Sequence, residues 1–370
     1  MRKIVDRPIR QLVRRIGAER YILIVLLCLS ASVSLTRFFL ELSDYPQLGN
    51  AELHFAHVLW GGLFLMVAAL LPLLFANRRV LNLSAIFAGI GMGLFIDEVG
   101  KFITQSNDYF YPAAAPIVYA FFLITLWIYM MVRSHRKQNA RSMLYEVLAL
   151  LEEYLDRDLS DVEKKRVLDL IDQAQALDAN HEYVALFSSI QDFIHSEQVH
   201  LVEHHADFFD RLKGKCEKFE QKHLPQKTFR RLVMTAMILW GVIAIIYPFL
   251  SITFSNDHAI LSGLWAELIN TQLPLLSESS ILLLLRLIGE VMVGILLLGS
   301  AFLIRIGKEI PAIRIAYTTL LVSISGIYML VFYYDQFSAI VFVLLQFVVF
   351  GLVARYRKRF VLPAQIEEIS

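Results

Sequence analysis

The sequence predicts an all-α protein, a polytopic membrane helix bundle of about eight transmembrane helices with a soluble helical insert. Hydrophobic residues make up 57% of the 370-residue chain, against roughly 45–50% in soluble domains. The apolar residues gather into runs of about 20, the length that crosses a bilayer core of about 30 Å as a helix. Every second segment that connects these runs contains lysine or arginine, and the connecting segments between them contain neither. Together these features predict a membrane protein.

Each predicted transmembrane segment meets the length that a spanning helix needs. The first segment follows a basic stretch that is long for a signal peptide, so we expect a retained anchor rather than a cleaved leader. The segments are 21–42, 53–76, 80–103, 112–132, 229–250, 279–304, 311–334 and 337–354.

The positive charges predict the orientation of these segments. Lysine and arginine lie in the N-terminal tail, at 78–79, 133–141, 222–231 and 305–314, and in the C-terminal tail. The loops around 47, 108, 262 and 336 contain acidic residues and neither lysine nor arginine. Because cytoplasmic loops carry the positive excess, both termini are expected in the cytoplasm. The expected location is the plasma membrane, and a bacterial inner membrane fits.

The chain divides into two predicted membrane blocks, 1–137 and 229–370, with a cytoplasmic helical domain at 138–228 between them. Amphipathic stripes predict the helices of this domain. A capping box of Ser160 and Glu163 predicts where one helix begins, and a last helix is expected over 197–223. The stripe residues are Leu144, Val147, Leu148, Leu151, Leu155, Val167, Leu168, Ile171, Val184, Phe187, Ile190 and Ile194.

The composition of the insert favours a protein partner over nucleic acid. Its charges are mixed in sign, so it does not resemble a basic nucleic-acid arm. His200, His204 and His205 could bind a metal at helical spacing, but an exposed polar face is the favoured interpretation, because a third ligand is not defined. A cytoplasmic protein that binds 138–228 is one partner that fits, and nucleic acid is not expected.

Motifs of soluble catalysis are absent from the sequence. The chain has no Walker-type loop, no Gly-x-Ser-x-Gly elbow and no His-Glu-x-x-His. The glycines at 89, 91 and 93 lie inside an apolar run, which favours helix packing over a dinucleotide loop. The two cysteines, Cys28 and Cys216, occur in different environments, so neither a disulfide framework nor a cysteine metal motif is predicted.

A group of ionisable residues lies near the outer ends of the second and third segments. His54 and His57 are three residues apart and would share a helix face, with Glu52 just before them. The third segment ends in Asp97 and Glu98. Because the two segments run in opposite directions, both groups are expected at the same depth.

Small residues predict that these two segments approach closely. Gly61 would lie about 6 Å deeper than His57, and Gly93 about 6 Å deeper than Asp97, at about 1.5 Å per residue. Packing of the two glycines would therefore bring the histidines to Asp97. The stripe in the third segment consists of Ala85, Gly89, Gly93, Asp97 and Lys101.

This constellation predicts a divalent metal site, because imidazoles with carboxylates suit Zn²⁺, Fe²⁺ or Mn²⁺. Two alternatives stay open: a proton or substrate relay, and a structural network in which Lys101 pairs with Asp97 and Glu98. The candidate metal ligands are Glu52, His54, His57 and Asp97. The candidate catalytic groups are Glu98 and Asp108.

The region 50–111 resembles a pattern in bacterial multipass membrane proteins of uncharacterised function. There, a helix start rich in glutamate and histidine precedes a glycine-rich helix that ends in Asp-Glu. The resemblance covers less than a fifth of the chain and implies no known activity. The matching residues are His54, His57, Trp60, Gly61, Gly89, Gly93, Asp97 and Glu98.

A second polar pair, Arg286 and Glu290, lies deeper in the sixth segment at i, i+4 spacing. A neutralised structural ion pair is the favoured interpretation, and the alternative is a cavity that holds a polar head group or conducts protons. Arg37 and Glu41, near the outer end of the first segment, are interpreted as interface anchors, with Arg37 reaching toward the surface.

Three function classes fit these features. The first is a metal-dependent enzyme at the outer leaflet that acts on a lipid or lipid-linked substrate, with metal-activated water. The second is a transporter or channel with a polar path through Arg286 and Glu290. The third is a sensor or scaffold that signals through 138–228.

Overall fold

The computed structural model describes residues 12–43, 49–50, 53–54, 57–106, 108, 111–134, 139–155, 157, 159–177, 181–196, 202, 211, 214–215, 218, 220, 222, 224–254 and 278–362. These residues are helical apart from connecting turns and a two-residue antiparallel pairing of β1 (Gly49–Asn50) with β2 (Leu53–His54). Seven stretches of described helix are long and apolar enough to cross a membrane. These helices agree with the predicted class, an all-α membrane protein.

Six of these stretches coincide with the first six predicted segments. The second begins at His57 and not at residue 53, because Leu53 and His54 are extended in β2. The third ends at Asp97, and the short α4 (Val99–Ile103) follows it. The six helices are α1 (Ala18–Leu42), α2 (His57–Leu74), α3 (Arg78–Asp97), α5 (Ala114–Arg133), α10 (Gln226–Phe254) and α12 (Glu278–Arg305).

The seventh stretch, Glu309–Val361, contains two arms that lie side by side. The first arm is α13 (Glu309–Val322), the π-helix η1 (Ser323–Ile327) and α14 (Tyr328–Asp335). The 3₁₀ turn η2 (Gln336–Ser338) leads into the second arm, α15 (Ala339–Tyr356) with the π-helix η3 (Arg357–Val361). The Tyr317 ring of α13 lies 5.2 Å from the Phe350 ring of α15. The chain therefore reverses at η2, between the seventh and eighth predicted segments.

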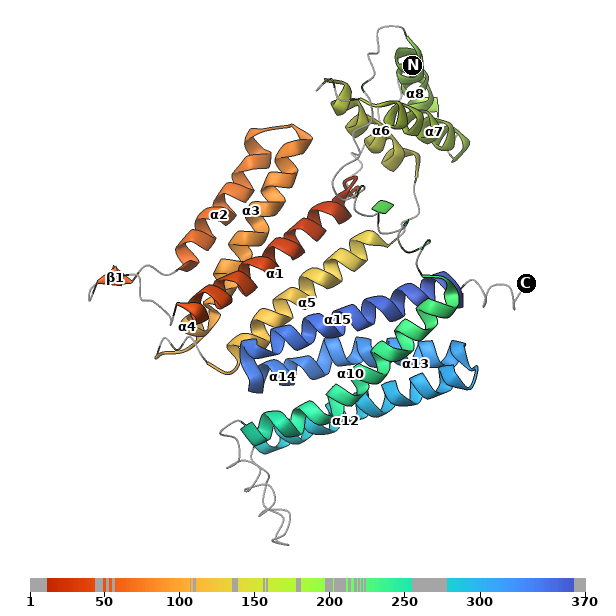
Figure 1. The fold of residues 1–370 in the computed structure, drawn as a ribbon. Helices are drawn as coiled ribbons and strands as arrows, with labels where there is room; N and C mark the ends of the chain where they lie inside the picture. The colour runs from red at the N-terminus through yellow and green to blue at the C-terminus, as the bar shows by residue number, and fades with distance from the viewer. Residues whose placement is uncertain are drawn as a thin grey trace. The chain divides into compact units, whose positions relative to one another are not determined.

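Contacts between helices divide the chain into two units. The first consists of Met1–Val33, Gln47–Phe95 and Ile124–Arg211, and the second of Ser34–Pro46, Ile96–Leu123 and Leu212–Ser370. Helices α1, α3 and α5 contribute to both units, so these units differ from the three sequential parts that the sequence predicts. In the second unit α10 packs along α12, and α13 packs against α12 and α15 (Figure 1).

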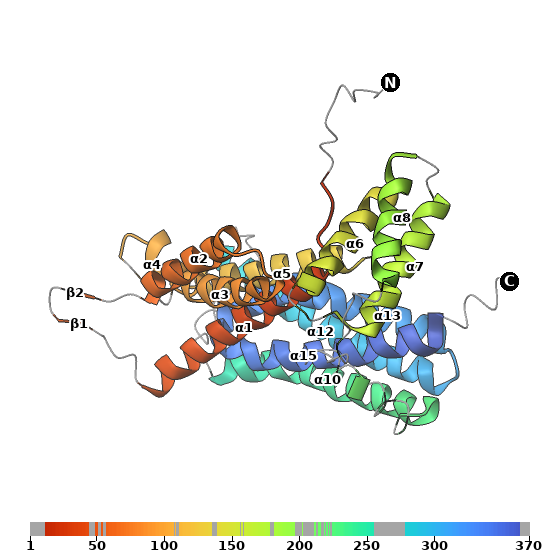
Figure 2. The same ribbon diagram turned by 90° about the horizontal axis from the view of Figure 1, so that it is seen from above.

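In the first unit, α6 (Ala140–Leu155), α7 (Asp161–Leu177) and α8 (His181–His195) pack around an apolar core of their own (Figure 2). This confirms most of the predicted stripes. Leu148 and Leu155 depart from the prediction, with 45% and 78% of their surface exposed. The core side chains include Leu144, Val147, Val167, Ile171, Phe187, Ile190 and Ile194.

The predicted capping box at the start of α7 is confirmed. The Ser160 backbone N–H donates to Glu163 Oε2 at 2.9 Å, and the Glu163 backbone N–H donates to Ser160 Oγ at 3.4 Å. The predicted helix over 197–223 falls mostly outside the described residues. His200, His204, His205 and Cys216 lie outside them as well.

Candidate functional site

Asp97 and Glu98, at the end of α3, are fully buried and each contacts a basic side chain. Arg37 Nε donates to Asp97 Oδ1 at 2.5 Å, and Arg37 Nη2 donates to the Asp97 carbonyl at 2.9 Å. Lys101 Nζ donates to Glu98 Oε1 at 2.8 Å. A cation beside a carboxylate repels a divalent metal ion. Of the predicted structural network, the pair of Lys101 and Glu98 is present, whereas Asp97 pairs with Arg37.

Arg37 differs from its predicted role as an interface anchor. The side chain is buried, with the residue 5% exposed, and it neutralises Asp97 on another helix. Its guanidinium carbon also lies 3.6 Å from the centre of the Phe337 ring in η2. Arg37 and Asp97 both stand near the outer ends of their predicted segments and carry opposite charges, but the sequence does not show that these two segments pack together.

The glycine stripe of α3 faces α1. A Cβ atom at Gly89 would lie 2.6 Å from Cys28 Cβ, and one at Gly93 would lie 2.7 Å from Ser32 Cβ. Gly61 of α2 meets Gly91 and not Gly93, with a Cβ 2.9 Å from the Gly91 carbonyl oxygen. The predicted packing of Gly61 on Gly93 is therefore wrong. The geometric reason for placing the histidines at Asp97 is lost with it.

The other residues of the predicted metal site do not form a ligand group in the described part of the chain. His57 is the first residue of α2, whereas His54 lies in β2, so the two do not share a helix face. Glu52 lies outside the described residues. The Asp108 backbone N–H donates to Thr104 Oγ1 at 2.7 Å. Among the described residues, three or more metal-ligating side chains do not come together.

A second ion-pair group connects α10, α12 and α14, and we call it the Arg286 site. Arg286 contacts Glu290 at 3.4 Å and binds Asp335 through Nη1 at 2.9 Å and Nη2 at 2.5 Å. Tyr247 donates its hydroxyl to Asp335 Oδ2 at 2.9 Å. The sequence predicted the pair of Arg286 and Glu290 but placed Asp335 in an outer loop. Asp335 is the last residue of α14, so its side chain reaches the membrane helices.

Among the described residues of the Arg286 site, two carboxylates share one guanidinium. Arg286 is 2% exposed and Glu290 8% exposed, and one guanidinium contacts two carboxylates. Its two terminal nitrogens bind Asp335, and its Nε makes the longer contact with Glu290 Oε1. Glu290 Oε2 is buried and without a hydrogen-bond partner. A buried charge is costly unless it is paired, so the site has one carboxylate more than Arg286 can neutralise.

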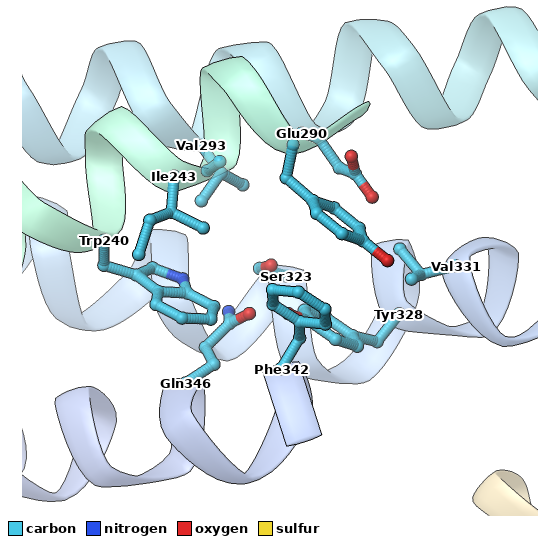
Figure 3. Close-up of a pocket in the computed structure, with 11 residues that line it drawn as sticks. Trp240, Ile243, Glu290, Val293, Ser323, Tyr328, Val331, Phe342 and Gln346 are labelled. Atoms are coloured by element: carbon cyan, nitrogen blue, oxygen red, sulfur yellow. The ribbon is translucent and has the colours of Figure 1, made fainter. Parts of the chain in front are cut away.

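A cavity opens beside Glu290 (Figure 3). The volume open to the centre of a water molecule is about 20 Å³. Gln346 is 1% exposed, and its Nε2 also lacks a hydrogen-bond partner. The cavity is lined by Trp240, Ile243, Ala244, Tyr247, Glu290, Val293, Ser323, Tyr328, Val331, Phe342 and Gln346.

Ser323, which lines this cavity, is the first residue of the π-helix η1. A π-helix changes the hydrogen-bond register, and such insertions are frequent at functional sites. Tyr119 of α5 donates its hydroxyl to the Ile324 carbonyl at 2.7 Å and therefore binds one acceptor of the irregular turn. Neither η1 nor a role for Gln346 was predicted from the sequence. The signal for Gln346 was a single amide inside the apolar run 339–354.

Comparison of the chain with protein-family models, with curated protein sequences and with solved structures gave no match.

Proposed function

We propose that this chain is a polytopic membrane transport protein that takes up and releases protons at Glu290. The observation that carries the proposal is the buried Glu290 carboxylate, which has an unpartnered oxygen beside a cavity and competes with Asp335 for one guanidinium. Ionisable groups in membrane helices are costly, and they mark ion and proton pathways. Binding of one proton at Glu290 would leave the site neutral.

The proposal includes eight crossings with both termini in the cytoplasm. The two arms of Glu309–Val361 would each cross once, because a single helix of 53 residues would be far longer than the bilayer core of about 30 Å. The loops that lack lysine and arginine would face outward. The α6–α8 domain would then be cytoplasmic, and Asp335 would lie toward the outer surface.

The metal-dependent enzyme has less support from the contacts. Arg37 and Lys101 bind the two carboxylates that were to hold or assist the metal. The polar path through Arg286 and Glu290 is therefore the better-supported class.

Proton flux tests the proposal. Purified protein in liposomes that contain a pH-sensitive dye should acidify or alkalinise the lumen when a potassium diffusion potential is imposed. Glu290→Gln should reduce the rate about 100-fold, as expected for loss of a proton-transfer group. Glu41→Gln, which changes an exposed carboxylate on α1, is the matched control and should keep the rate. Equal rates in wild type and Glu290→Gln would reject the proposal.

Signalling through the α6–α8 domain is a second candidate, and one contact favours it. Arg78, the first residue of α3, forms an ion pair with Glu153 of α6. This pair joins a predicted membrane helix to the domain that has its own core. Movement of α3 would therefore be transmitted to α6. If a protein partner binds the wild type but not the Arg78→Ala variant, and α6–α8 stays folded in that variant, this candidate is supported.

A further inference from the structure

Two buried polar groups of the cavity lack partners, and they come from different helices. Glu290 Oε2 is on α12 and Gln346 Nε2 is on α15. Neither group can be explained as a surface side chain, since the residues are 8% and 1% exposed. An unmade hydrogen bond of a buried group costs about 1–3 kcal/mol. Two such groups around one cavity indicate an occupant that bonds to them.

The size of the cavity restricts the occupant. A cavity needs about 10–15 Å³ on this measure to hold one water molecule, and the cavity offers about 20 Å³. An organic substrate does not fit this volume. The lining offers a carboxylate oxygen at Glu290, a hydroxyl at Ser323 and an amide at Gln346. Water can accept a hydrogen bond from the amide or donate one to the carboxylate, so its chemistry suits either unpartnered group.

The polar groups are arranged in order of depth along the helices. Asp335 ends α14, and Ser323 lies twelve residues before it, about 18 Å deeper at about 1.5 Å per residue. Gln346 lies seven residues into α15, about 10 Å below its start by the same rise. In Figure 3 the Gln346 amide and the Ser323 hydroxyl lie near Trp240, and Glu290 lies at the other end of the pocket. The cavity therefore extends from Glu290 away from the Asp335 end.

We propose that this cavity binds an ordered water that relays the proton between Glu290 and the interior side of the Arg286 site, and that Gln346 is the residue that positions it. This rests on the proposed proton transfer at Glu290. In the relay, a protonated water gives its proton to Glu290 Oε2 and becomes neutral water. The net charge of Arg286, Glu290 and Asp335 changes from minus one to zero. Release runs the same step in reverse.

The groups that face Glu290 are consistent with this path. Arg286 is on the same helix, and Asp335 and Tyr328 are on α14. Tyr247 faces the cavity from α10, and α15 contributes the uncharged Phe342 and Gln346. A second cation is not among these groups. The proton that neutralises Glu290 would therefore arrive through the water site.

Two measurements test the water site separately from the flux. Infrared difference spectroscopy should show a protonated-carboxyl band that is absent in Glu290→Gln. It should also show a water O–H band that shifts when H₂¹⁸O replaces H₂¹⁶O. In Gln346→Leu the water band should disappear, because the water loses the amide that positions it. Gln346→Asn keeps an amide and should keep the water band.

Proton flux should fall about tenfold in Gln346→Leu, the factor for one lost hydrogen bond, and should recover in Gln346→Asn. Ser323→Ala tests the other polar lining group and should give a smaller loss. A flux that depends on Glu290 but is unchanged in Gln346→Leu, with an unchanged water band, would overturn the water site and leave the proposed function standing. A water band that depends on Gln346 without any flux through Glu290 would overturn the proposed function instead.

Discussion

Arg286 binds Asp335 through both terminal nitrogens, at 2.9 and 2.5 Å, although 49 residues separate them along the chain. This pairing turns the guanidinium away from its neighbour on the same helix, so Glu290 receives one contact of 3.4 Å. A guanidinium that bridges two helices also fixes the end of α14 against α12. The pair therefore determines both the packing of the helices and the charge that remains on Glu290.

Replacement of Asp335 by asparagine should abolish proton uptake at Glu290. The change removes the excess negative charge, and Arg286 becomes free to form a full ion pair with Glu290. We expect a proton flux as low as in Glu290→Gln, with the fold retained because asparagine keeps the shape and can still accept from Tyr247. Flux in liposomes and melting in detergent are the measurements. Asp335→Asn with wild-type flux would show that the charge excess is not what drives proton binding.

The pair of Arg37 and Asp97 predicts a large loss of stability when one partner is removed. Arg37→Ala would remove the ion pair of the fully buried Asp97 carboxylate, and breaking a buried pair costs about 3–5 kcal/mol. The free energy of unfolding, measured by denaturant titration in detergent, should fall by that amount. Arg37→Met combined with Asp97→Leu should regain most of it, since apolar replacement of a buried pair is often neutral. Full stability of Arg37→Ala alone would contradict the pairing.

Helix positions could be predicted from the sequence because length and hydropathy determine them locally. The predicted span 279–304 became Glu278–Arg305, and the span 112–132 became Ala114–Arg133. The charge partners could not be predicted in the same way. Arg37 pairs with a residue 60 positions away and Arg286 with one 49 positions away. Helical spacing within one segment does not show which faces of two segments contact each other.

The predicted metal site depended on one assumption about packing. Close approach of Gly61 to Gly93 would have aligned His57 with Asp97, but Gly61 meets Gly91 and Gly93 meets Ser32. Glycines at 89, 91 and 93 point to two sides of α3, because 100° of rotation per residue separates alternate positions by about 200°. The sequence shows the positions of the small residues, but it does not show which neighbour each one contacts.

Glu153 of α6 predicts a pH dependence of stability outside the membrane helices. Burial and, to a smaller extent, a hydrogen bond with Glu163 raise the pKa of the Glu153 carboxyl, Arg78 lowers it, and the resulting pKa is about 8. Because the folded pKa lies above the ordinary value of 4.5, the stabilising contribution is complete below about pH 4.5 and is lost as pH rises to about 8. Unfolding of α6–α8 should therefore become easier over that window.

Circular dichroism melting of the full chain in detergent at several pH values between 4.5 and 8.5 would measure this effect. Glu153→Gln mimics the protonated carboxyl and should flatten the profile over this window. Asp169→Asn on α7 is the control, and it should keep the wild-type profile. A Glu153→Gln profile that still falls between these pH values would assign the dependence to other groups.

The neighbouring glycines of α2 provide the last prediction, because they differ only in what lies beside them. A Cβ at Gly61 would lie 2.8 Å from the Phe95 backbone nitrogen and 2.9 Å from the Gly91 carbonyl oxygen, whereas a Cβ at Gly62 meets nothing within 4 Å. Gly61→Ala should therefore separate α2 from α3 and destabilise the protein by about 1–3 kcal/mol, as overpacking does. Gly62→Ala should be neutral or stabilise by up to about 1 kcal/mol, because alanine favours the helix. The opposite signs can be measured by denaturant titration of the two variants in the same detergent. Equal effects would show that α2 does not approach α3 at Gly61.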